Sequence, residues 1–93
     1  MGDLLQVVHN DDARTVRLIG ELDASNAEAL LDDLGPKLGE GSTLTLDLTE
    51  LSFVDSMGLR SILRAAAALG TGGRLILYGP QRPVARTFEL VGL

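Results

Sequence analysis

Short apolar segments that alternate with amphipathic segments constrain the fold of this chain most. The apolar segments have the length and pattern of β-strands and are expected at residues 4–9, 15–19, 42–48 and 74–78. Helical spacing follows the last three, which gives the order β-β-α-β-α-β-α. Because strands joined through helices run parallel, we expect an α/β domain with a mixed, mostly parallel four-stranded sheet and helices packed against it. The turn Asn10-Asp11-Asp12 predicts a first strand that is antiparallel at one edge.

The helical segments carry apolar residues three and four positions apart. The first is expected to begin with a capping box of Ser25 and Glu28 and to end early at Gly35-Pro36. The second is expected at residues 57–69 and ends before Gly70. Its inward residues are predicted to be Leu59, Ile62, Leu63 and Ala66, and its outward residues Arg60, Ser61, Arg64 and Ala68. The third is expected from Pro83 to Gly92, with Val84, Phe88 and Val91 inward.

Composition excludes several classes of function. Eight basic and 13 acidic residues give a net charge of −5, which argues against direct nucleic-acid binding. Hydrophobic residues make up 45% and aromatic residues 3%, so an aliphatic core is expected. The absence of cysteine excludes disulfides and thiolate metal sites. No apolar run approaches the ~20 residues of a membrane span, so we expect a cytoplasmic protein without membrane insertion.

Functional residues of open α/β sheets gather where the parallel strands end. Residues 20–23, 51–58 and 79–82 are expected to reach that edge. The most informative of them is Asp55-Ser56-Met57-Gly58. Ser56 should lie at or beside the N-terminus of the second helix, where free N–H groups and the helix dipole favour negative charge and can receive a phosphate.

The same turn has a simpler interpretation, in which Asp55 and Ser56 only cap the helix and contribute ~1 kcal/mol. Gly58, just inside the helix, costs roughly 1 kcal/mol relative to alanine, which indicates that something approaches the backbone closely. Both interpretations of the turn stay open at this point.

Two enzymatic or phosphotransfer alternatives are weaker. Asp23, Asp47 and Asp55 could hold Mg²⁺ in a receiver-like acceptor, but the chain lacks an early acidic pair, and its only lysine, Lys37, is not at a late strand end. A serine hydrolase would need a base near Ser56, and the only histidine, His9, is on the first strand. A Walker-type phosphate loop is also missing. We therefore expect neither catalysis nor a metal or other cofactor.

The sequence resembles the STAS family, and within it the anti-sigma factor antagonists. The resemblance runs from about Val16 to Leu93. It is carried by Leu18-Ile19-Gly20-Glu21-Leu22-Asp23, Leu46-Asp47-Leu48, Leu51-Ser52-Phe53-Val54-Asp55-Ser56-Met57-Gly58-Leu59, Gly72-Gly73-Arg74-Leu75-Ile76-Leu77 and Phe88-Glu89-Leu90-Val91-Gly92-Leu93. The Asp-Ser-x-Gly-Leu turn after an aliphatic strand is its most specific part.

The resemblance implies that Ser56 is a phosphoacceptor. The kinase would be the partner itself, an anti-sigma factor with ATP-dependent serine kinase activity. The unphosphorylated protein would bind this partner and free the sigma factor, the phosphorylated protein would not bind, and a phosphoserine phosphatase would restore binding. Asp23 and Asp55 would flank the serine, and Met57 and Gly58 would lie in the partner footprint. From helical periodicity we add Arg60, Ser61 and Arg64 to this surface.

Two departures from the family pattern concern Met57, where many relatives have Ser or Thr, and the end of the chain. Relatives commonly continue past Gly92-Leu93 with one more strand and helix, which a single STAS domain at residues 1–93 would lack. The resemblance also allows a homodimer. It leaves open a role as a non-catalytic STAS subunit of a transporter or lipid-export ATPase complex, or as a stressosome component.

Overall fold

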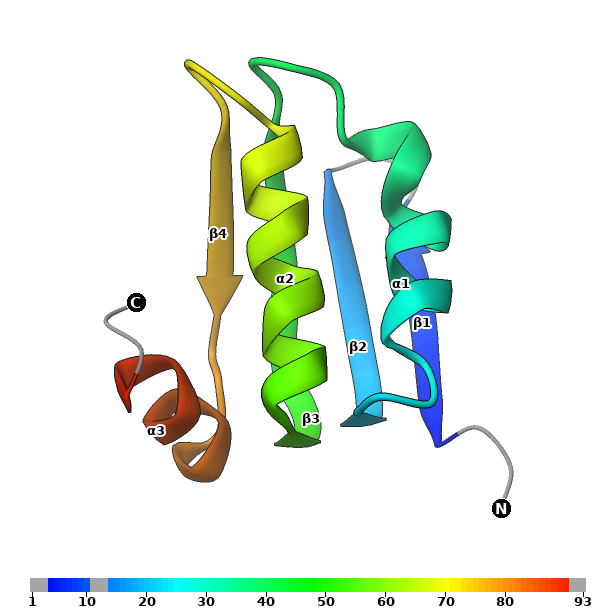
Figure 1. Ribbon diagram of the computed structural model, residues 1–93, viewed down its shortest axis with the longest axis vertical. Coiled ribbons are helices and arrows are strands. Elements are labelled where there is room, and N and C mark those ends of the chain that lie inside the picture. Colours follow the sequence, from blue (N-terminus) through cyan, green and yellow to red (C-terminus); the bar gives the residue numbers. More distant parts are fainter. Residues whose placement is uncertain (1–3, 11–13, 91–93) are drawn as a thin grey trace.

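A computed structural model describes residues 4–10 and 14–90 of the chain (Figure 1). The strands are β1 (Leu5–Asn10), β2 (Thr15–Leu22), β3 (Thr43–Val54) and β4 (Arg74–Tyr78). The helices are α1 (Ala27–Leu34), α2 (Ser56–Ala68) and α3 (Arg82–Leu90), and a 3-10 turn, η1 (Gly35–Lys37), follows α1. The predicted order β-β-α-β-α-β-α is confirmed. The expected turn at Asp11 and Asp12 and the expected roles of Val91 and Gly92 lie outside the described residues.

The strands form one mixed sheet in the order β1-β2-β3-β4. β1 is antiparallel to β2, whereas β2, β3 and β4 are parallel. Both crossovers, through α1 and through α2, step across the sheet in the same direction. Crossovers of one hand that step in one direction place their helices on one face, and Figure 1 shows α1 and α2 side by side in front of the sheet. α3 lies beyond the end of β4, at the edge of the sheet that β4 forms (Figure 1).

The core lies between this sheet face and the helices. Its fully buried side chains are almost all aliphatic, as the composition predicts, and Phe88 of α3 is the aromatic residue among the buried set. The members that fix the layers are Leu18 and Leu22 of β2, Leu44, Leu46, Leu48 and Leu51 of β3, Leu30 and Leu34 of α1, Leu59 and Ile62 of α2, and Val84 of α3.

β2 and β3 are longer than predicted. β2 continues to Leu22 and β3 to Val54. The pairing of the two strands shifts register twice, between Arg17 and Ile19 and again between Gly20 and Glu21. At each shift β3 contains one residue more than β2, as in a β-bulge. The bulges change the spacing of buried residues in β3 from two to three, so period-two alternation ends at Leu48 although the strand does not.

The predicted capping box of α1 is wrong. Asn26 is the N-cap, and its side chain makes no capping hydrogen bond. Asn26 Oδ1 instead accepts from the Asp23 N–H at 3.0 Å, and its Nδ2 donates to the Glu21 carbonyl at 3.0 Å. The hydroxyl of Ser25 donates to Asp23 Oδ1 at 2.6 Å rather than capping the helix. The predicted early end of this helix is confirmed, because α1 stops at Leu34 and the next three residues form the 3-10 turn.

The buried face of α2 also differs from the prediction. Leu59 and Ile62 are buried as expected, but Leu63 is 39% exposed and Ala66 is exposed. Ser61 and Ala65 are buried in their place. Small residues on this line let the helix axis lie close to the sheet, so the helix turns its small side chains inward and leaves the larger Leu63 at the margin.

Candidate functional site

Asp55 joins the end of β3 to the beginning of α2 and to the neighbouring turn. Its Oδ1 accepts from the Gly58 N–H at 2.8 Å, which makes Asp55 the N-cap of α2. Its Oδ2 accepts from the Ala24 N–H at 3.2 Å, and its own N–H donates to the Leu22 carbonyl at 3.1 Å. The carboxylate therefore has a structural role on both sides, in the helix and in the β2–α1 turn.

Ser56 is the first residue of α2 and is exposed. Asp55 supplies the cap, so the hydroxyl of Ser56 is not needed for it, and it makes no hydrogen bond to another described residue. The capping interpretation of the turn is thus correct for Asp55 and wrong for Ser56. The exposed residue lies at the positive end of a helix dipole, where a phosphate can be attached without displacing a described side-chain contact.

Gly58 is buried, and the close approach that its presence predicts comes from within the chain. A Cβ at this position would lie 2.7 Å from both Cγ and the carbonyl oxygen of Leu22, and 2.9 Å from Cγ2 of Val54. Gly58 therefore lets the first turn of α2 pack on the ends of β2 and β3. Gly58 is buried and has no side chain, so it affects the expected partner footprint only by setting the position of the helix backbone.

Asp23 lies in the turn between β2 and α1 and is partly buried. Its Oδ1 accepts from the N–H of Ser25 at 2.9 Å as well as from the Ser25 hydroxyl. The bond from Ala24 to Asp55 brings this turn next to the Asp55-Ser56 turn. The structure thus places Asp23 and Asp55 in adjoining turns at one edge of the sheet.

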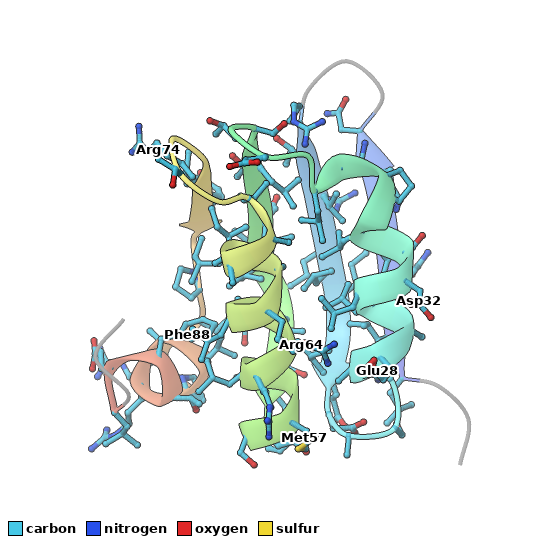
Figure 2. All side chains as sticks on the ribbon, turned by 45° about the horizontal axis from the view of Figure 1, so that its top comes forward. Glu28, Asp32, Met57, Arg64, Arg74 and Phe88 are labelled. Carbon is cyan, nitrogen blue, oxygen red and sulfur yellow. The ribbon has the colours of Figure 1, made fainter. Side chains whose placement is uncertain are left out.

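The outward side of α2 next to Ser56 carries Met57, Arg60 and Arg64. Met57 is 45% exposed at the N-terminal end of the helix (Figure 2). Nη1 of Arg64 lies 2.9 Å from Oε2 of Glu28 on α1, and Figure 2 shows the two side chains reaching across the gap between the helices. These residues line a hollow together with the buried Ser61, and its other side is formed by the β2–α1 turn and α1 through Ala24, Ala27, Glu28 and Leu31.

Ser61 does not belong to this outward face, and its predicted exposure is wrong. It is 3% exposed, and its hydroxyl donates to the Gly58 carbonyl at 2.6 Å. This hydrogen bond is made within the helix and gives the hydroxyl a partner, so a polar residue can occupy a buried position. Helical periodicity predicts an outward Ser61 together with Arg60 and Arg64, but the face of α2 that the structure buries includes Ser61 and Ala65 instead of Leu63 and Ala66.

The residues that the two alternative chemistries need are far apart. Asp47 pairs with Arg17 and Val54 with Leu22, five positions further along β2, so roughly 17 Å of strand separates Asp47 from the strand end that Asp55 follows. His9 pairs with Val16 near the start of β2, whereas Ser56 follows the strand end at which Leu22 pairs with Val54. Nε2 of His9 lies 3.3 Å from Oδ1 of Asp33 on α1. Within residues 4–10 and 14–90, no three His, Cys, Asp or Glu side chains gather closely enough to hold a metal ion.

Sequence reasoning missed two residues of the site. Ala24 contributes a backbone N–H, which no side-chain pattern reveals. Glu28 was assigned to a capping box, although it instead pairs with Arg64 across the helices. The pair could have been suspected from the sequence, because a Glu and an Arg on consecutive amphipathic helices can lie opposite each other when the helices pack side by side.

Fold and site together define a small α/β binding domain with an exposed serine at the N-terminus of α2. Residues 5–93 match the family model of the STAS domain, and the chain belongs to this family. An anti-sigma-B factor antagonist of Listeria monocytogenes is 37% identical over 76 residues, which cover 80% of this chain and 67% of the relative. The anti-sigma-B factor antagonist of Bacillus subtilis is 29% identical over 90 residues, which cover 96% of this chain and 83% of the relative.

Solved structures show the same fold. The unphosphorylated form of the anti-sigma factor antagonist SpoIIAA superposes with a TM-score of 0.79 at 29% identity, covering 96% of this chain and 81% of that one. The phosphorylated form of Bacillus SpoIIAA gives a TM-score of 0.71 at 28% identity, covering 96% and 84%. Part of the murine anion transporter Slc26a9 also matches, with a TM-score of 0.72 at 25% identity over 84% of this chain and 13% of that one. None of the helices in the described part of this chain is long and apolar enough to cross a membrane.

Proposed function

We propose that this protein is an anti-sigma factor antagonist whose binding is controlled by phosphorylation of Ser56. In its unphosphorylated form it binds an anti-sigma factor and thereby allows transcription by the sigma factor. The anti-sigma factor acts as the serine kinase, and a phosphoserine phosphatase reverses the modification. The protein itself is a non-catalytic binding module without a cofactor, and it acts in the cytoplasm.

The observation that carries this proposal is that Asp55 and Ser56 have different roles. Asp55 caps α2 and ties down the β2–α1 turn, while Ser56 is exposed at the first helical position. A kinase can therefore reach the hydroxyl without unfolding the helix. The similarity to antagonists solved in both phosphorylated and unphosphorylated forms supports the same assignment.

The proposed switch works by blocking an interface rather than by refolding. A phosphate adds about −1.5 to −2 charges beside Asp55 and in a turn that adjoins Asp23. Burying such a charge unpaired in an interface costs ~2–5 kcal/mol. Because a hundredfold loss of affinity needs only ~2.7 kcal/mol, this penalty is large enough to separate the partners.

The partner surface that we propose surrounds Ser56. Met57 supplies an apolar contact, and Arg60 and Arg64 supply positive charge on the exposed side of α2. Asp23 and Asp55 hold the two adjoining turns in place, and Gly58 contributes from inside by setting the position of the helix, whereas Ser61 is buried and offers the partner no exposed group.

The test uses a candidate anti-sigma factor kinase with ATP and compares the wild type with Ser56→Ala. We expect acid-stable phosphate on the wild type and none on the variant. Ser56→Asp is expected to bind the kinase at least about tenfold more weakly than the wild type, the equivalent of ~1.4 kcal/mol. A Ser56→Asp protein that binds as tightly as the wild type would refute the blocking mechanism.

The match to part of an anion transporter favours a second candidate, in which the domain is a non-catalytic STAS component of a transporter complex. A lipid-export ATPase complex or a stressosome would be a related setting. Co-purification of the tagged protein from its host separates these roles, because an antagonist brings down a kinase and a transporter component brings down a membrane protein. Sedimentation of the purified protein tests the homodimer that the family resemblance allows.

A further inference from the structure

We propose that Arg60 is the intramolecular partner of a phosphate on Ser56, so that modification both adds a negative charge and withdraws a positive one from the surface of α2. This inference rests on the proposed function because it takes Ser56 as the phosphoacceptor. It goes further in assigning a specific cation to the phosphorylated state.

Ser56 and Arg60 lie four residues apart on α2, and both are exposed. Residues at this spacing are neighbours on one helix face. Helical side chains lean toward the N-terminus of their helix, so the guanidinium group of Arg60 leans toward the turn that contains Ser56. An arginine one turn away on the same helix face can donate two hydrogen bonds to a phosphate.

The other groups near Ser56 are already engaged. Asp55 occupies the N–H of Gly58, which removes one of the helix donors that would otherwise meet a phosphate. Arg64 is one turn further along and pairs with Glu28 on α1. The side chain of Arg60, in contrast, makes no ion pair or hydrogen bond with any residue in the described part of the chain.

The negative charges around the site explain why such a partner is needed. Asp55 precedes the serine, Asp23 lies in the adjoining turn, and Glu28 faces the same side from α1. Asp55 and Asp23 are held by N–H and hydroxyl donors, and Glu28 is neutralised by Arg64. A phosphate dianion introduced here is therefore repelled by carboxylates and has Arg60 as its available counter-charge.

The experiment installs phosphoserine at position 56 during protein synthesis, so that no kinase is required, and uses the full chain. The pH titration of the phosphorus NMR signal gives the second pKa of the phosphate, which is about 6 for free phosphoserine. A neighbouring cation favours the dianion and lowers this pKa. We expect Arg60→Gln to raise the pKa by about 0.3 to 0.7 relative to the wild type, as for an exposed ion pair. Arg60→Lys should give an intermediate value, because it retains the charge and loses the planar geometry.

Glu28→Gln combined with Arg64→Gln is the matched control, since it removes the neighbouring ion pair without leaving Glu28 unpaired, and it should leave the pKa unchanged. Coincident thermal unfolding of the unphosphorylated proteins shows that the exposed substitutions preserve the fold. An unchanged pKa in Arg60→Gln, or an equal rise in the Glu28→Gln/Arg64→Gln double variant, overturns the inference.

Failure of the proposed function gives a different result. In that case, the protein with phosphoserine at position 56 binds the anti-sigma factor as tightly as the unmodified protein. The phosphorus titration does not depend on that measurement, so the two proposals stand or fall separately.

Discussion

The α-carbon of Gly58 lies against Leu22, so that a single added carbon would come within 2.7 Å of Cγ and of the carbonyl oxygen of Leu22. This contact joins the first turn of α2 to the end of β2. It also lies two residues from Ser56, so the packing of the sheet decides where the exposed serine is held.

Gly58→Ala should therefore destabilise the protein. Alanine gains about 1 kcal/mol of helix propensity, but the clash with Leu22 and Val54 is an overpacking cost of about 1–3 kcal/mol, and the backbone oxygen cannot rotate away. We expect a net loss of roughly 1 kcal/mol in urea unfolding. Gly35→Ala is the matched control, because nothing lies within 4 Å of its added Cβ. It should be neutral or slightly stabilising, and equal effects of both substitutions would contradict the packing argument.

Asp55→Ala should cost more stability than Ser56→Ala. The first substitution removes the cap on Gly58 and the bond to Ala24, and loss of a cap alone costs about 1 kcal/mol. The second removes a hydroxyl without a described partner, and surface substitutions of that kind stay within about 0.5 kcal/mol. Thermal unfolding of both variants at pH 7 measures the difference. A larger loss for Ser56→Ala would mean that the serine, not the aspartate, supports the helix.

Much of the fold follows from sequence pattern, because the alternation of strands and helices determines both pairing and crossover direction. Leu59, Ile62 and Val84 all occupy the core as their periodicity predicts. What the pattern could not predict are the two bulges that prolong β3 to Val54. They depend on the tertiary pairing with β2, and the polar residues between Leu48 and Leu51 resemble the end of a strand.

The site was predictable to a similar degree. The turn at Asp55 and Ser56 is visible in sequence, but the roles of its two residues are not, because either side chain can cap a helix. Ser61 was misplaced because its burial depends on a hydrogen bond to the Gly58 carbonyl. The burial of Ser61 is set by how closely α2 approaches the sheet, which depends on the contact of Gly58 with Leu22.

The burial of Ser61 leads to a prediction about binding. Ser61→Ala removes a hydroxyl bonded within the helix and no exposed group, so the affinity for the anti-sigma factor should stay within about twofold of the wild type, or ~0.4 kcal/mol. Arg64→Ala, on the exposed side of the same helix, should weaken binding about threefold or more, as for a charge at an interface. Calorimetric titration with both variants measures the contrast. Stronger weakening by Ser61→Ala would place the partner surface elsewhere.

Asp47 is expected to make the stability of the protein depend on pH in the acid range. The hydroxyl and the N–H of Thr49 both donate to Oδ1 of Asp47, at 2.6 Å and 2.9 Å, and these bonds, together with nearby Arg17, hold the pKa of this carboxyl below its usual 3.8 against a small opposing effect of burial. A carboxyl whose pKa is lowered on folding stabilises the folded state above its unfolded pKa and loses that contribution as the pH falls through its folded pKa. The wild type should therefore lose stability more steeply than Asp47→Asn as the pH falls below about 4, and the two curves should converge at lower pH.

Thr49→Ala removes the strongest donor and should flatten the curve in part, whereas Thr49→Ser keeps the hydroxyl and should follow the wild type. Urea unfolding between pH 2 and 7 measures all four curves, and identical slopes for the wild type and Asp47→Asn would show that the Thr49 bonds carry no net preference for the charged carboxylate.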